Sequence, residues 1–92
     1  MLKAAYPYYL GNQPVYANQE LAVTDKFSGE VVTRVSLADR DAIERAIELA
    51  VEAQEPLRAL ASYERREVLD HCVQRFRERA EELARALCIE AG

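Results

Sequence analysis

The sequence predicts an α/β fold in which two short strand hairpins precede two antiparallel amphipathic helices. Short runs of β-branched and aromatic residues, separated by turn residues, indicate strands between residues 8 and 35. Two later stretches carry apolar residues at helical spacing, and they predict helices over residues 40–54 and 62–91. A chain of 92 residues makes one domain at most, and it buries about two-thirds of its surface on folding.

The first hairpin is predicted from its turn. Gly11 and Asn12 separate Tyr8–Leu10 from Val15–Tyr16, and glycine readily takes the positive φ of a two-residue hairpin turn. Pro14 has no backbone N–H to donate, so the returning strand is very short or lies at an edge.

The second hairpin joins two runs with the alternation of a strand. In the first run Leu21 and Val23 alternate with Glu20, Ala22 and Thr24; in the second, Val31, Thr33 and Val35 alternate with Val32 and Arg34. The link between them begins with Asp25 and ends near Gly29, and both residue types favour turns.

The first helix is expected to begin after Asp39, a favourable N-cap residue, and to end before Pro56. Its apolar stripe has the spacing i, i+3, i+4, i+7 and i+8 and consists of Ile43, Ala46, Ile47, Ala50 and Val51.

The second helix is expected to begin at Ser62 as its N-cap and to run without interruption to residue 91. Its apolar set is Leu69, Cys72, Val73, Phe76, Ala80, Leu83, Ala84 and Leu87. Such a helix is about 42 Å long, more than a 92-residue globule can cover. We therefore expect it to protrude, or to pack on protein outside this chain.

Charge and composition exclude several classes of partner. The net charge of −4 disfavours nucleic acid, and no apolar run approaches the roughly 20 residues of a membrane span. The opening residues contain no apolar stretch of signal-peptide length, so we expect a cytoplasmic protein without membrane partners.

The sequence offers no catalytic or cofactor-binding motif. With three glycines it has neither Gly-x-Gly-x-x-Gly nor a P-loop, and no Cys or His spacing fits zinc. Cys72 and Cys88 lie about 24 Å apart along the predicted helix, too far for a disulfide. We expect both to be small buried residues of the apolar face, and His71 to be a surface or boundary residue.

Several local patterns resemble, in order and spacing, the N-terminus of the aldehyde dehydrogenase superfamily. The resemblance covers the chain from about Tyr9 to Gly92. The family's Asn-Pro-x-Thr-Gly-Glu turn has a counterpart in Asp25–Glu30, where the Asn-Pro is replaced and the Gly-Glu is kept. The other matching segments are Tyr9–Gln13, Asp41–Ile47, Glu64-Arg65, Glu81–Ala84 and Glu90–Gly92.

The resemblance implies that residues 1–92 are the N-terminal portion of a cofactor-binding domain. Family members oxidise aldehydes to carboxylic acids with NAD or NADP, using a cysteine and a glutamate that lie far beyond position 92. Neither Cys72 nor Cys88 matches that cysteine's context. The resemblance thus implies an inactive scaffold whose partner is the remainder of the same enzyme. It also implies that this enzyme is a homo-oligomer.

Two further expectations concern ligands. Some family members hold a monovalent cation partly through backbone carbonyls, which here implies Val23 and Thr24. The link from Pro56 to Arg65 resembles the branch acting on lactaldehyde and glyceraldehyde phosphate, which implies a small oxygenated or phosphorylated aldehyde.

The alternative to an enzyme segment is a stand-alone helical-hairpin module that binds proteins through its long helix and has no enzymatic activity.

Overall fold

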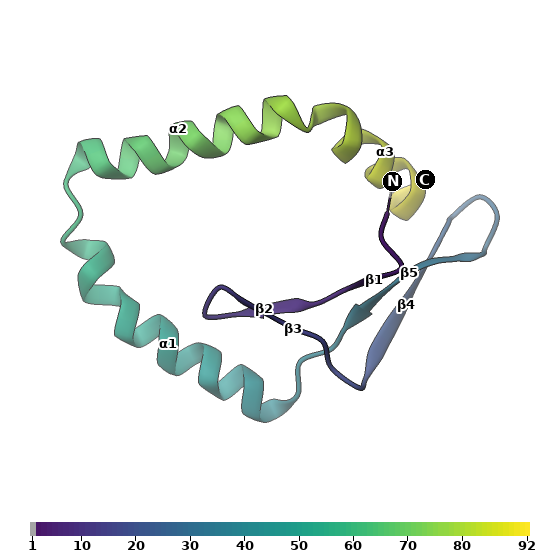
Figure 1. Cartoon of the computed structure of the whole chain (residues 1–92), viewed down its shortest axis with the longest axis horizontal. Helices are drawn as coiled ribbons and strands as arrows, with labels where there is room; N and C mark the ends of the chain where they lie inside the picture. The colour runs from purple at the N-terminus through teal and green to yellow at the C-terminus, as the bar shows by residue number, and fades with distance from the viewer. Residues whose placement is uncertain (1) are drawn as a thin grey trace.

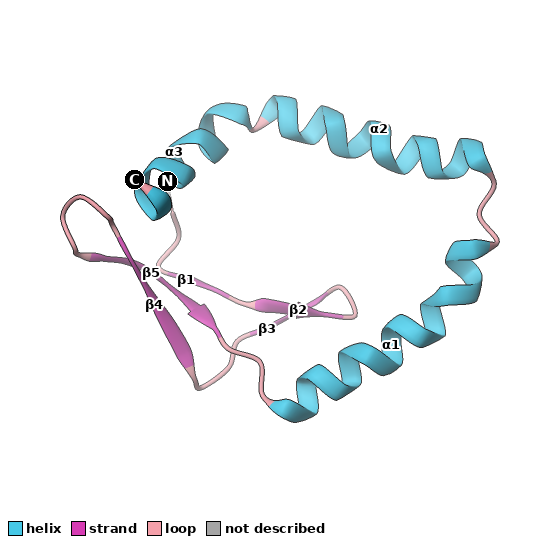
Figure 2. Cartoon of the chain, turned by 180° about the vertical axis from the view of Figure 1, so that it is seen from behind, coloured by secondary structure: helices cyan, strands magenta, loops and turns pink. Residues whose placement is uncertain are grey.

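The computed structural model describes residues 2–92 and has the predicted α/β character (Figure 1). Strands and helices occupy separate parts of the chain, as Figure 2 shows by colour. The strands are β1 (Ala5–Tyr6), β2 (Tyr8–Leu10), β3 (Gln13–Val15), β4 (Glu20–Thr24) and β5 (Val31–Ser36). The helices are α1 (Arg40–Arg58), α2 (Ser62–Glu78) and α3 (Ala80–Ala91).

The predicted first hairpin is confirmed as β2 and β3. The two strands pair antiparallel, with Tyr8 opposite Val15 and Leu10 opposite Gln13. Gly11 and Asn12 form the turn, and both have positive φ values, of 56° and 65°. Positive φ at both central residues is the mark of a type I′ turn, whose twist suits a hairpin.

The second hairpin is also confirmed, and it forms the larger sheet with a strand that the sequence did not predict. β4 pairs antiparallel with β5, and β1 pairs parallel with the other edge of β5, giving the order β1-β5-β4. β1 has only two residues, too few for any periodicity to indicate a strand. In the β4–β5 link, Asp25 Oδ1 accepts hydrogen bonds from the backbone N–H groups of Phe27 (2.7 Å) and Ser28 (3.2 Å).

Helix α1 begins as predicted but ends later. Asp39 Oδ1 accepts a hydrogen bond of 2.8 Å from the Ala42 N–H. The predicted end before Pro56 is wrong, because the helix continues through this proline to Arg58. Proline in the last turn removes one backbone bond, because it has no N–H to donate to the Glu52 carbonyl. At the end of the helix, where carbonyls have no intrahelical donor, Arg65 Nη2 donates to the carbonyl oxygens of Leu57 (2.5 Å) and Arg58 (3.2 Å).

Two predictions for the second helix are wrong. The N-cap is Ala61 and not Ser62, and Glu64 Oε1 accepts the Ala61 N–H at 3.2 Å, a role that a side chain three residues on can fill. The predicted single helix over residues 62–91 is interrupted at Arg79, whose φ of −108° and ψ of 15° leave the helical region. The interruption turns α3 toward the sheet, where it lies against β4 (Figure 1).

The chain is thin and open. Its extents are 48 × 35 × 16 Å, and its radius of gyration is 16.8 Å, whereas a compact domain of this length has about 12 Å. Figure 1 shows α1 and α2 meeting at a corner and spreading apart from it, so they do not pack along their lengths. Among residues 2–92 no hydrophobic side chain is fully buried, and the buried residues are Thr33 and Ser36.

The two cysteines are not buried, because the open chain covers neither of them. Both Cys72 and Cys88 are exposed, so the prediction that they are buried is wrong for this chain. In α2 every residue except Glu64 is exposed, because no other described element covers the helix. His71 is exposed, as predicted.

Candidate functional site

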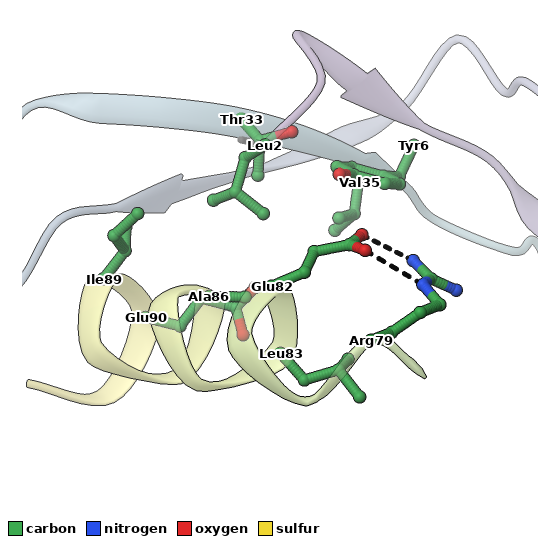
Figure 3. Close-up of a pocket in the computed structure, with 10 residues that line it drawn as sticks. All are labelled: Leu2, Tyr6, Thr33, Val35, Arg79, Glu82, Leu83, Ala86, Ile89 and Glu90. Atoms are coloured by element: carbon green, nitrogen blue, oxygen red, sulfur yellow. Dashed lines mark hydrogen bonds and ion pairs between the residues drawn. The ribbon is translucent and has the colours of Figure 1, made fainter. Parts of the chain in front are cut away.

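A cavity lies between α3 and the three-stranded sheet (Figure 3). Its volume is about 260 Å³. Residues from the opening segment, from β5 and from α3 line it: Leu2, Tyr6, Thr33, Val35, Arg79, Glu82, Leu83, Ala86, Ile89 and Glu90.

The walls of this cavity are mainly apolar. Figure 3 shows Ile89 projecting from α3 toward the strands, while Leu2 and Val35 project from the opposite side toward α3. A backbone hydrogen bond of 3.2 Å from the Lys26 N–H to the Ile89 carbonyl ties the end of the helix to the β4–β5 link. The cavity is thus a seam along which α3 is held to the sheet.

An ion pair stands at one end of the seam. Arg79 donates from Nη2 to Glu82 Oε1 at 2.6 Å and from Nε to Glu82 Oε2 at 3.0 Å. These hydrogen bonds lower the pKa of the Glu82 carboxyl and raise the pKa of the Arg79 guanidinium. A carboxylate whose pKa is lowered is a weaker base, so Glu82 is poorly suited to general base catalysis near neutral pH.

The two hydroxyl groups of the seam are not activated. Tyr6 Oη accepts a hydrogen bond of 3.0 Å from the Lys3 N–H. Thr33 is 2% exposed, and its Oγ1 has no hydrogen-bond partner among the described residues. A nucleophilic hydroxyl needs a base within hydrogen-bond reach, and neither group has one in the part of the chain that the structure describes.

The backbone carbonyls proposed from sequence for a cation belong to the last two residues of β4. Val23 lies opposite Thr33 in the sheet, and the pairing becomes irregular between Val23 and Thr24. The Thr24 carbonyl accepts a hydrogen bond of 3.4 Å from Lys26 Nζ. Sequence reasoning missed this lysine, although a long basic side chain two residues after the carbonyl can fold back onto it.

No other grouping within residues 2–92 has the composition of a metal site, since no three His, Cys, Asp or Glu side chains gather there. Cys72 and Cys88 lie on different helices, and neither lines the seam. None of the described helices is both long enough and apolar enough to cross a membrane.

The chain matches the model of a known protein family. A model described as the aldehyde dehydrogenase family matches residues 15–92. The match starts at the last residue of β3 and includes both strands of the second hairpin and all three helices.

Proposed function

This chain belongs to the aldehyde dehydrogenase family, and we propose that it is the N-terminal scaffold segment of an NAD(P)-dependent enzyme that oxidises an aldehyde to a carboxylic acid. The family match over residues 15–92 is the observation that carries this proposal. According to this proposal, residues 1–92 form part of the cofactor-binding domain of the enzyme and have no activity alone. The rest of the same enzyme is their partner.

The exposed surface of the chain supports a scaffold role. The accessible surface is 7816 Å², whereas a folded monomer of 10.4 kDa has about 5,400 Å². The apolar side chains of α1 and α2 contribute to this excess, including Ile43, Ile47, Val51, Leu69 and Phe76. Exposed apolar surface of this extent marks a site at which other protein packs on the chain.

The residues of this chain do not fit a dinucleotide. Three glycines, at positions 11, 29 and 92, cannot form the glycine-rich turn that approaches a pyrophosphate. NAD(P), when bound, supplies the hydride acceptor of the reaction, and we assign no step of that chemistry to residues 1–92. Their proposed contribution is to position neighbouring elements.

The monovalent cation at the Val23 and Thr24 carbonyls remains part of the proposal, with a condition. The Lys26 ammonium already donates to the Thr24 carbonyl, and its positive charge competes with a bound cation. A cation therefore requires Lys26 to swing away. We expect Lys26→Gln in the full enzyme to increase the response of thermal stability to potassium, with Lys3→Gln as the control.

The resemblance also supports a cytoplasmic, homo-oligomeric parent enzyme without nucleic-acid or membrane partners. The net charge of −4 is in keeping with the exclusion of nucleic acid, which binds proteins mainly through basic surfaces.

A chimera tests the proposed function. Residues 1–92 replace the corresponding N-terminal segment of an active aldehyde dehydrogenase, and aldehyde-dependent reduction of NAD and of NADP is measured. We expect activity from the chimera and none from the same enzyme lacking the segment. A folded chimera without activity contradicts the scaffold role. Saturable micromolar binding of NAD to isolated residues 1–92 in calorimetry would contradict the proposal that these residues do not hold the dinucleotide.

A further inference from the structure

The last carbonyl of β4 points away from the rest of the sheet. The N–H of the next residue, Asp25, donates inward to the Glu30 carbonyl at 2.9 Å. Backbone groups of successive residues in an antiparallel ladder point to opposite sides, so those of Thr24 face outward. Because β4 stands at the edge of the order β1-β5-β4, no other described strand pairs with the Thr24 carbonyl.

The Lys26 ammonium lies in front of this carbonyl. Its Nζ is 3.4 Å from the Thr24 carbonyl oxygen. This separation is long for a directional hydrogen bond, so the contact is mainly the attraction of a positive charge for the carbonyl dipole. A monovalent metal cation binds a carbonyl oxygen through the same attraction. The lysine thus offers Thr24 the charge that a bound cation would offer.

The base of the Lys26 side chain is held in place by the end of α3. The Lys26 N–H donates to the Ile89 carbonyl at 3.2 Å. A Cβ added at Gly92 would lie 3.6 Å from Lys26 Cβ, so the lysine stem begins beside the last residue of the chain. A side chain with a fixed base loses less freedom when its charged end binds. The docked helix therefore favours the contact between the ammonium and Thr24.

No carboxylate within residues 2–92 pairs with this ammonium. Asp25 and Glu30 are close to it in the sequence, yet the ion pairs of the described residues are all formed by arginines. Asp25 Oδ1 instead accepts hydrogen bonds from the N–H groups of Phe27 (2.7 Å) and Ser28 (3.2 Å). The Lys26 charge is thus directed to a backbone carbonyl and not to a side chain.

From these observations we infer that the Lys26 ammonium is a built-in replacement for the monovalent cation at the Val23 and Thr24 carbonyls. Two positive charges at such short range repel each other, so potassium or sodium is excluded while the ammonium is in place. The parent enzyme then holds the end of β4 without an added cation. The inference rests on the proposed function in one respect, namely the position of the cation.

Equilibrium dialysis of the full enzyme against radioactive rubidium, a potassium analogue, tests the replacement. We expect the wild type to bind rubidium about tenfold more weakly than Lys26→Met, which has no charge before the Thr24 carbonyl. Lys26→Arg keeps the charge and Lys3→Met removes the other lysine of the chain, so both should behave as the wild type does. Equal binding by the wild type and Lys26→Met, or binding by neither, overturns the inference.

Thermal unfolding of the full enzyme gives an independent readout. Tetramethylammonium chloride supplies a cation too large to sit at a carbonyl, and potassium chloride replaces it at equal ionic strength. We expect the same unfolding midpoint in both salts for the wild type. Lys26→Met should have a lower midpoint in tetramethylammonium and recover it in potassium.

A wild-type enzyme that gains as much stability from potassium as Lys26→Met does would overturn the replacement. Neither experiment depends on the activity of the chimera, in which the scaffold role is measured. Failure of this inference is therefore distinguishable from failure of the proposed function.

Discussion

Two regions of the molecule are held together by different kinds of contact. One is the sheet end, which comprises the three-stranded sheet and α3; the other is the corner at which α1 meets α2. At the sheet end, residues distant in sequence meet: Ser36 Oγ accepts the Ala17 N–H at 3.0 Å, and the Lys26 N–H donates to the Ile89 carbonyl at 3.2 Å. At the corner, all contacts are local. Arg65 donates to the Leu57 carbonyl at the end of α1, and Glu64 accepts a hydrogen bond from the Ala61 N–H at the start of α2.

This difference decides which part of the chain depends on a partner. Long-range hydrogen bonds fix the sheet and α3 relative to one another, whereas local caps fix only the ends of α1 and α2. Most helical stability in proteins comes from packing an amphipathic face, and the face of α2 is unpacked. We therefore expect the sheet end to be more stable by itself than the corner.

The largest expected effect is at Ser36. Ser36 is buried, and Ser36→Ala leaves the partly buried Ala17 N–H without its partner, so the free energy of unfolding should fall by about 1–3 kcal/mol. Ser62→Ala at the exposed start of α2 should change it by less than about 0.5 kcal/mol. Urea unfolding followed by circular dichroism measures both, and equal losses would remove the contrast between the two regions.

The next largest effect is the loss of stability on replacing Gly11 by alanine, compared with the same change at Gly29; both glycines have a positive φ. Gly11→Ala should cost about 1–2 kcal/mol, because an alanine there adopts a left-handed conformation. Its Cβ would also lie 3.1 Å from Leu49 Cδ1 of α1. Gly29→Ala meets no atom within 4 Å and should cost less. Thermal unfolding of the two variants decides the order, and a greater loss at Gly29 would show that the approach of Leu49 adds no cost at Gly11.

At the corner, the informative residue is Arg65. Arg65→Met removes the donor to the Leu57 and Arg58 carbonyls, and the local opening free energy near the end of α1 should fall by about 1 kcal/mol. Arg66→Met, which loses only an exposed ion pair with Asp70 at 3.8 Å, is the control. Hydrogen exchange of the amides in residues 55–60 measures the effect, and similar rates in both variants would show that Arg65 does not close the corner.

The smallest effect concerns the exposed Arg79–Glu82 pair. The hydrogen bonds from Arg79 lower the pKa of Glu82, so this carboxyl should titrate below the other glutamates, and Arg79→Gln should raise its pKa. The pair contributes its full stability above the unfolded pKa of glutamate and loses it as pH falls through the lowered value. Carboxyl ¹³C shifts follow the titration; an unchanged pKa in Arg79→Gln would contradict the assigned cause.

Local chemistry predicted the hairpins and the start of α1. The Gly11-Asn12 turn and the Asp39 cap follow from backbone preferences that act within a few residues, and the structure confirms both. The end of α1 did not follow, because Pro56 removes only the bond to the Glu52 carbonyl and the helix continues to Arg58. The terminal carbonyls of Leu57 and Arg58 accept hydrogen bonds from Arg65, eight and seven residues further on.

Contacts between distant segments account for the remaining differences. β1 exists only because Ala5 and Tyr6 pair with β5, and α3 diverges from α2 at Arg79 to reach the sheet. The burial predicted for Cys72 followed from the apolar stripe of α2, but periodicity gives the direction of a face and not what covers it. Periodicity likewise could not predict the seam, whose lining comes from three segments far apart in the sequence: the opening residues, β5 and α3.

Hydrogen exchange of residues 1–92 alone and within the full enzyme tests most directly whether α2 depends on a covering partner. We expect protection of the α2 amides to be low in the isolated segment and to rise in the full enzyme, where other parts of the protein cover Val68–Phe76, while protection in β5 changes less. Protection of α2 that is already as high as that of β5 in the isolated segment would contradict this dependence. It would show that the 92-residue chain stabilises its long helix alone, as a free-standing module would.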